Sequence, residues 1–149
     1  MRGVRRRTLL QSMLTAALVP PRGWTIEAPS GERAEELTAM VYELRVYHVS
    51  AGKMGDLLGR FRDHTEKLFE RHGMKNLAYW NPMDEPEKSN TLIYILRHPS
   101  REAAIANWKA FQNDPDWKSV KEKSEANGKL TEKIDSTFME LTDFSRAPK

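Results

Sequence analysis

The chain has 149 residues, which suits a single domain with one hydrophobic core. Apolar residues make up 39% and charged residues 30%, a balance typical of globular rather than disordered or fibrous proteins. The net charge of +3 arises in residues 1–26, which hold five arginines and no acid, whereas residues 27–149 hold 19 basic and 21 acidic side chains. Because this larger part is net negative, we expect no nucleic-acid partner.

The sequence contains no cysteine, which excludes disulfides, zinc–thiolate sites, iron–sulfur clusters and thiol nucleophiles. The histidines do not form a metal-binding pattern either. His64 and His72 would be about 12 Å apart along a helix axis, and His48 and His98 stand at the ends of two predicted strands. We therefore predict no metal site and no cofactor.

The N-terminal segment has the pattern of an export leader. A cluster of arginines precedes the uncharged stretch Thr8–Pro21, which is too short to span a bilayer as a helix. The run Arg6-Arg7-Thr8-Leu9-Leu10 resembles the bacterial twin-arginine export signal. We predict a leader over residues 1–27 and a polar linker over residues 28–39, and hence a periplasmic or secreted protein without a membrane span.

Two alternatives to export remain open for this segment. It is rich in arginine and free of acidic residues, which is also typical of a mitochondrial transit peptide. Translation could also begin at Met40, directly before the first predicted strand, and the protein would then be cytoplasmic.

Residues 40–145 form the predicted domain, which begins with a strand and a long helix. The segment Met40–Val49 is rich in β-branched and aromatic residues, which favours a strand. Apolar residues then recur at spacings of three and four from Met54 to His72, which predicts one amphipathic helix ending at Gly73.

The second half of the domain repeats this alternation. Two further strands are predicted over residues 75–81 and Thr91–His98, and the polar loop between them makes the pair a hairpin. Ser100 is the expected N-cap of a second long helix, which the Asp114-Pro115 step interrupts. A short charged helix over residues 116–127 and a last strand over residues 134–144 complete the domain.

This β-α-β-β-α-β order predicts an α+β, ferredoxin-like fold, with a four-stranded antiparallel sheet and the helices on one face. The other face would be uncovered and substantially apolar, so two subunits are expected to pack their sheets together around a cavity. On the first strand we expect Tyr42, Leu44 and Val46 to meet the helices. The opposite side chains would then line the cavity, and the predicted ligand pocket comprises Glu43, Arg45, Tyr47, Trp80, Ile93 and Ile95.

Three of the polar side chains are candidates for catalysis. Arg45 would bind an anionic or enolate oxygen, Tyr47 would donate a proton, and His64, beside the apolar stripe of the first helix, would move protons. The structural alternative is an ion pair from Glu43 to Arg45 across the dimer interface, with Tyr47 closing the barrel and His64 forming a hydrogen bond at the edge of the core.

Two arginines of the first helix have a similar pair of interpretations. Arg60 and Arg62 flank Phe61 and would either hold a carboxylate or phosphate at a pocket mouth or simply be solvated.

Several short segments of the domain together resemble the NIPSNAP family. They are Tyr42-Glu-Leu-Arg-Val-Tyr47, Gly52-Lys53, Arg60-Phe-Arg-Asp-His-Thr65, Leu68-Phe69, His72-Gly73 and Tyr79-Trp80. The resemblance implies a dimeric α/β barrel, akin to small cofactor-independent monooxygenases, but the family has no settled enzymatic reaction. We therefore expect an exported homodimer that binds a small apolar ligand or a protein partner. The alternatives are a monooxygenase-like enzyme and a haem-associated barrel, both acting in the cavity.

Overall fold

The computed structural model describes residues 40–146 and residue 148. The predicted leader, residues 1–27, and the predicted linker, residues 28–39, lie outside the described residues. Within the described part of the chain, no helix combines the length and apolar character that a membrane crossing needs.

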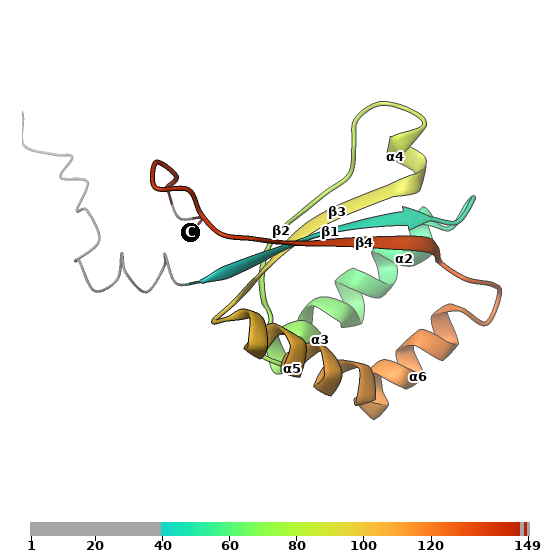
Figure 1. The fold of residues 1–149 in the computed structure, drawn as a ribbon. Coiled ribbons are helices and arrows are strands. Elements are labelled where there is room, and N and C mark those ends of the chain that lie inside the picture. The colour runs from blue at the N-terminus through green and yellow to red at the C-terminus, as the bar shows by residue number, and fades with distance from the viewer. Residues whose placement is uncertain (1–39, 147, 149) are drawn as a thin grey trace, which may run out of the picture.

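Four strands form a single antiparallel sheet, as predicted (Figure 1). They are ordered β2-β3-β1-β4 across the sheet. This order places the first strand in the middle of the sheet, beside the third and the fourth. The bounds of the strands are β1 (Val41–Val49), β2 (Lys75–Trp80), β3 (Thr91–His98) and β4 (Thr131–Met139).

The last strand begins earlier and ends earlier than the sequence suggests. Thr131 already pairs with Val49, although residues 131–133 carry no apolar side chain that would mark them as part of a strand. At the other end, Met139 pairs with Tyr42 near the start of β1. Residues beyond Met139 therefore have no neighbouring strand to pair with, which ends β4.

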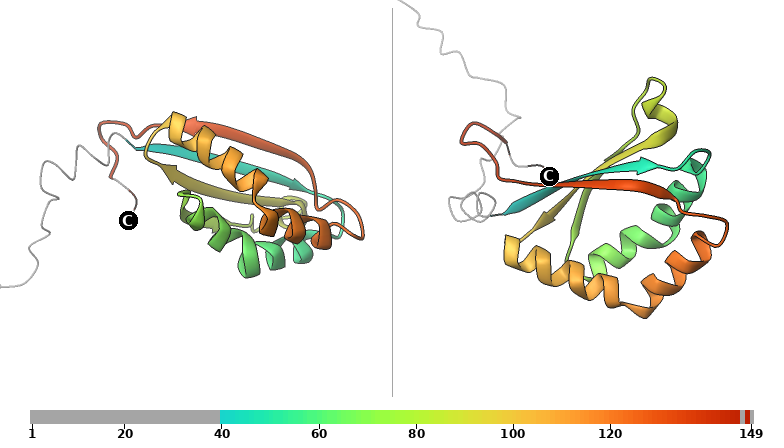
Figure 2. Two further views of the ribbon diagram at one scale, coloured as in Figure 1. Left: turned by 90° about the horizontal axis from the view of Figure 1, so that it is seen from below. Right: turned by 45° about the vertical axis from the view of Figure 1, so that its right-hand side comes forward.

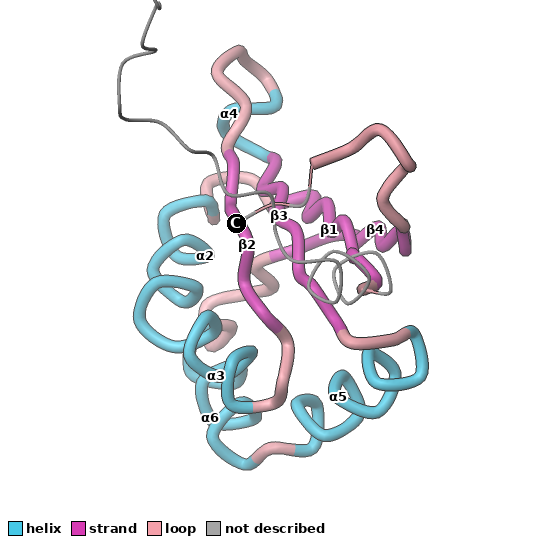
Figure 3. Tube along the Cα trace, turned by 90° about the vertical axis from the view of Figure 1, so that its left-hand side faces the viewer, coloured by secondary structure: helices cyan, strands magenta, loops and turns pink. Residues whose placement is uncertain are grey.

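The long helices cover one face of the sheet (Figure 2). A continuous helical run follows β1. In the helix that follows β3, the Ser100 hydroxyl accepts a hydrogen bond from the Ala103 amide at 3.1 Å, which confirms the predicted N-cap. A short helix in the β2–β3 connection projects away from the helix layer (Figure 3). The helical segments are α2 (Met54–Arg60), η1 (Phe61–Thr65), α3 (Glu66–Arg71), α4 (Glu87–Asn90), α5 (Arg101–Asn113) and α6 (Pro115–Ser124).

The first helical run contains a π-helical turn, η1, that the spacing of apolar residues does not reveal. Inside this turn the Thr65 hydroxyl donates to the carbonyl of Arg60 at 3.2 Å. Gly73 ends the run in the left-handed region, with φ +73°, as predicted. The π-turn directs Phe61 and Thr65 into the core and leaves His64 exposed.

Between sheet and helices lies a core of aromatic rings, which pack against one another edge to face, tilted or stacked. Phe69 of α3 lies at its centre, with ring centroids 4.9 Å from Phe111 and 5.3 Å from Trp108 of α5. On the sheet side, Tyr94 of β3 is fully buried and contacts Tyr47 of β1 at 5.3 Å. These contacts show which side of β1 faces the helices.

The side chains of β1 point to the opposite faces of the sheet from those we predicted. Because Tyr47 packs in the core against the helices, the alternation of the strand also turns Glu43 and Arg45 toward the helix layer. Tyr42, Leu44 and Val46, expected to meet the helices, instead point to the other face of the sheet, where Tyr42 is nevertheless buried. Alternation alone leaves the choice of face open, and the charges of Glu43 and Arg45 can lie on the helix side because hydrogen bonds within the domain accommodate them there.

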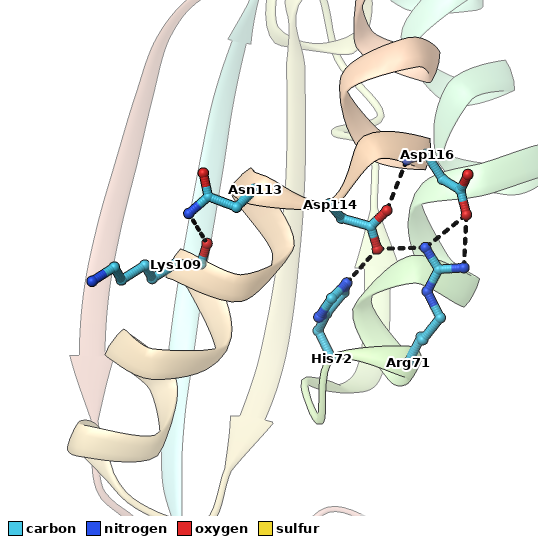
Figure 4. A network of polar contacts seen from close by, with 6 residues as sticks. All are labelled: Arg71, His72, Lys109, Asn113, Asp114 and Asp116. Carbon is cyan, nitrogen blue, oxygen red and sulfur yellow. Dashed lines mark hydrogen bonds and ion pairs between the residues drawn. The ribbon is translucent and has the colours of Figure 1, made fainter.

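A charged network joins the end of α3 to the junction between α5 and α6 (Figure 4). Asp114 caps α6 by accepting a hydrogen bond from the Asp116 amide at 2.8 Å, and its other oxygen meets His72 Nε2 at 2.6 Å. Arg71 bonds both Asp114 and Asp116. Hydrogen bonds from His72 and Arg71 hold the pKa of Asp114 well below its usual range. The sequence indicates Asp114 only as a helix break, not as the partner of two cations.

Candidate functional site

A buried carboxylate, Glu43, is the centre of the most concentrated polar cluster in the described residues. Each of its oxygens is shared by two partners. Oε1 accepts from Arg45 Nη1 at 2.9 Å and from the Ser136 hydroxyl at 2.6 Å, while Oε2 meets Trp108 Nε1 at 2.6 Å and His98 Nε2 at 3.1 Å. The carboxylate therefore links β1, β3, β4 and α5.

The electrostatics of the cluster keep Glu43 ionised. Burial alone would raise its pKa, but hydrogen bonds from His98, Ser136, Trp108 and Arg45 outweigh it and lower the pKa to about 2. A carboxylate with so low a pKa, and with both oxygens occupied, is a poor general base near neutral pH. The role of Glu43 is to hold the side chains around it.

Arg45 is the side chain that Glu43 holds most directly. Its guanidinium lies 4.3 Å from the ring centroid of Trp108, within the range of a cation–π contact, and 5.8 Å from that of Tyr47. Burial would lower the pKa of Arg45, but nearby Tyr94, Tyr47 and Glu43 raise it, so Arg45 stays charged. The predicted Glu43–Arg45 ion pair exists, but within one chain rather than across a dimer interface.

The predicted ligand pocket does not form as one site. Its six residues divide between the two faces of the sheet, because Glu43, Arg45 and Tyr47 face the helices while Ile93 and Ile95 lie on the other side. Trp80 pairs with Ile93 and shares its face. The prediction of a single cavity lined by all six is therefore wrong.

Of the other two catalytic candidates, Tyr47 lies beside Arg45 but within the core, whereas His64 is not brought together with them. Tyr47 is buried in the core and accepts a hydrogen bond from the Tyr94 hydroxyl at 3.0 Å. His64 is exposed on η1 and faces a separate open groove of about 510 Å³ between α2 and α6.

The same groove shows where Arg60 lies. Its side chain is buried, and Nη1 donates to Glu125 Oε1 at 3.0 Å and to the Ser124 hydroxyl at 3.3 Å. The ring of Trp117 lies 5.2 Å from the guanidinium. Arg60 thus fastens α2 to the end of α6. It lines the groove but is not solvated, in contrast to the second prediction, and the carboxylate that it holds is Glu125 of the same chain. Arg62 is exposed.

Within residues 40–146, no three or more His, Asp or Glu side chains gather in an arrangement that could hold a metal ion.

Sequence reasoning missed Ser136 and His98 as partners of Glu43. The only indication of these two partners is the register of the strands. Ser136 lies opposite Arg45, and Leu96, which precedes His98 by two residues, lies opposite Glu43.

Acid is expected to destabilise the fold through Glu43. Its pKa falls from 4.5 in the unfolded chain to about 2 in the folded one, so its contribution is complete above pH 4.5 and is lost as the pH falls toward 2. We expect this loss to reach about 3 kcal/mol. Urea unfolding of the wild type and of Glu43→Gln at pH 6 and pH 3 would test it. A pH dependence as steep in the variant as in the wild type would contradict the assignment.

Comparison with known proteins assigns the fold. The family model described as NIPSNAP matches residues 42–146. The chain belongs to the NIPSNAP family. This match confirms the resemblance that the sequence segments indicate. No curated protein matches this NIPSNAP chain.

Solved structures with the same fold agree with this assignment. A NIPSNAP family protein of unknown function from Agrobacterium tumefaciens has 21% identity and a TM-score of 0.61, with 72% of this chain and 93% of that chain covered. A NIPSNAP-like domain protein from Burkholderia xenovorans has 13% identity and a TM-score of 0.64, covering 75% and 93%. A monooxygenase from Streptomyces coelicolor, solved with nanaomycin D, has 14% identity and a TM-score of 0.51, covering 71% and 90%. The predicted ferredoxin-like class of this NIPSNAP domain is thus confirmed.

Proposed function

We propose that this NIPSNAP protein is a homodimeric binding protein, in which two subunits pack the uncovered faces of their sheets together and hold a small apolar ligand or a protein partner. The observation that carries the proposal is the apolar character of that face over β1, β2 and β3; its β4 side is polar, because Asp135 lies opposite Val46 and bonds His48 at 2.8 Å. Leu44 and Val46 of β1 lie beside Ile95 and Ile93 of β3, and all four are only partly buried. Trp80 extends this surface and is 48% exposed.

The arrangement of the sheet supports a second copy as the partner. The long helices of residues 40–146 all lie on the other face (Figure 1), so they do not cover these side chains. A contiguous apolar surface of this kind is unfavourable in water, and a two-fold axis lets the same surface cover itself.

Binding is a better interpretation than catalysis because two of the polar side chains on β1, Glu43 and Tyr47, are already engaged. Glu43 accepts hydrogen bonds on both oxygens, and Tyr47 lies in the core. The alternative is a cofactor-independent monooxygenase, whose fold the Streptomyces coelicolor structure shares. Oxygen uptake with phenolic substrates that is lost in Arg45→Ala would favour this enzyme, and a Soret band in the purified protein would favour a haem-associated barrel.

The dimer is tested by Val46→Glu. A glutamate at position 46 would bury a further negative charge in the interface, directly opposite Asp135, so we expect the variant to be monomeric at concentrations at which the wild type is dimeric. Light scattering after size exclusion gives the mass of each.

The matched control is Val120→Glu, which makes the same change on α6 in the helix layer and should leave the dimer intact. Thermal unfolding of all three proteins checks that each is folded. A wild type that is monomeric at micromolar concentration, or a dimer unaffected by Val46→Glu, would contradict the proposed interface.

Export remains part of this proposal because of the twin-arginine pattern at Arg6 and Arg7. Native mass spectrometry of the protein recovered from its natural host reports the mature N-terminus, the number of subunits and any retained ligand together. We expect a mature chain that starts near Ala28, and a chain that still carries the arginine cluster would argue against export.

A further inference from the structure

The guanidinium of Arg45 has more hydrogen-bonding capacity than its surroundings use. An arginine carries five N–H donors. Within residues 40–146, Arg45 donates from Nη1 to Glu43, and the Tyr94 hydroxyl also lies near its guanidinium. Its buried Nε has no partner in this part of the chain. The side chain is nevertheless 15% exposed, so the group reaches the surface of the molecule. An acceptor from outside the chain can therefore approach the exposed part of the guanidinium, although not the buried Nε.

The chemistry of the cluster holds this guanidinium in place for such an acceptor. Glu43 anchors it from one side, and the ring of Trp108 supports its flat face at 4.3 Å. Because Glu43 also receives hydrogen bonds from Ser136, Trp108 and His98, the carboxylate does not depend on Arg45 alone for its stabilisation. A second anion can therefore approach Arg45 without separating the pair. A fixed, planar donor of this kind suits a carboxylate.

Exposed apolar side chains lie next to Arg45 on the helix-facing side of β4. Ser136 is opposite Arg45 in the register and Ile134 is opposite Tyr47, so Ile134 is the diagonal neighbour of Arg45 on the same face. Ile134 is 41% exposed even though this is the side that the helices cover elsewhere.

The neighbouring helix presents a second exposed side chain along the same edge. The guanidinium of Arg101 in α5 lies 4.7 Å from the ring of Phe138 in β4, which places this side of α5 against β4. Ile105 follows Arg101 by one helical turn and therefore points the same way. It is 61% exposed. Ile105 thus lies on the side of α5 that faces β4, the strand that carries Ile134.

We propose that Arg45, together with the exposed Ile134 and Ile105, binds the carboxylate of a small organic acid with an apolar, planar body. The acid group would accept from the N–H donors of Arg45 that reach the surface, and the body would cover the two isoleucines. This site lies on the opposite face of the sheet from the proposed dimer interface, so it needs no second copy and goes beyond the proposed function.

The test uses the full chain labelled with ¹⁵N and titrated with sodium benzoate. Trp108 is the reporter, because its indole N–H lies in the Glu43 cluster and its ring is stacked on Arg45. We expect a saturable shift of the Trp108 indole resonance with benzoate. Benzamide, which has the same shape without the charge, should bind about tenfold more weakly or not at all.

Two variants locate the binding. Arg45→Lys keeps the positive charge beside Glu43 but loses the planar fork, and it should weaken benzoate binding about tenfold or more. Ile134→Glu places a negative charge beside the ligand and should also weaken binding. Val120→Glu, in the distant α6 groove, is the matched control and should bind as the wild type does. Dispersed spectra and an unchanged thermal midpoint establish that a variant is folded.

The outcomes separate this site from the proposed dimer. Equal binding of benzoate and benzamide, unchanged binding in Arg45→Lys, or no shift of Trp108 would overturn the site and leave the dimer untouched. Benzoate binding that depends on Arg45 in a monomeric wild type would overturn the dimer and leave the site in place.

Discussion

Glu43→Ala is expected to lower the free energy of unfolding by about 3–5 kcal/mol, because it removes one partner of a buried ion pair. Arg45 would then be left without its carboxylate, and the side chains of Trp108 and Ser136 would lose their acceptor. Glu43→Gln keeps the shape and part of the hydrogen bonding, so its effect should be smaller, at about 1–3 kcal/mol.

Urea unfolding at pH 7, with all proteins at one concentration, measures these differences. Glu122→Ala is the matched control, since Glu122 is exposed on α6 and the substitution should change stability by less than about 0.5 kcal/mol. If Glu43→Ala were no more destabilising than Glu122→Ala, the cluster would contribute little to the fold.

Phe69→Ala is expected to cost about 3–5 kcal/mol, because a large buried ring would be replaced by a cavity. Phe69 is almost fully buried and lies between the sheet and α5, where its ring contacts Phe61, Tyr94 and Phe111. These rings come from three different elements, so neighbouring side chains cannot easily move into the space.

Chemical unfolding followed by tryptophan fluorescence measures this effect, since Trp108 contacts the Phe69 ring. Phe144→Ala is the control, because Phe144 is exposed beyond the end of β4 and should be almost neutral. An equal effect of the two substitutions would mean that Phe69 does not lie at the centre of the core.

The order of the elements could be predicted because local patterns determine it. The apolar spacing from Met54 to His72, the cap at Ser100 and the left-handed Gly73 are all properties of short segments. The start of β4 could not be predicted in this way, since residues 131–133 join the sheet through backbone hydrogen bonds that polar side chains do not reveal. The apolar spacing does not reveal the π-turn for a similar reason. The turn shifts the direction of the side chains around the helix axis, but no residue type marks its presence in the sequence.

The candidate site was harder to predict because it depends on which face of a strand is covered. The sequence correctly groups Glu43, Arg45 and Tyr47 on one side of β1, but it does not say that Tyr47 fills the core. The partners of Glu43 come from three other elements, and Ser136 is 93 residues away along the chain. Contacts at such separations follow from register and packing, which the pattern of one strand does not contain.

The two edge strands of the sheet, β2 and β4, limit how copies of this protein can associate. An edge strand with unpaired backbone groups can pair with strands of further chains, and the assembly then grows without end, as in fibrils. β4 carries the exposed charges Glu132 and Lys133, and β2 starts with the exposed Lys75 and has a bulge between Asn76 and Ala78. The exposed charges and the bulge both discourage further strands from pairing with these edges. The self-association proposed above, through the face of the sheet that carries Leu44 and Val46, would therefore stop at a dimer.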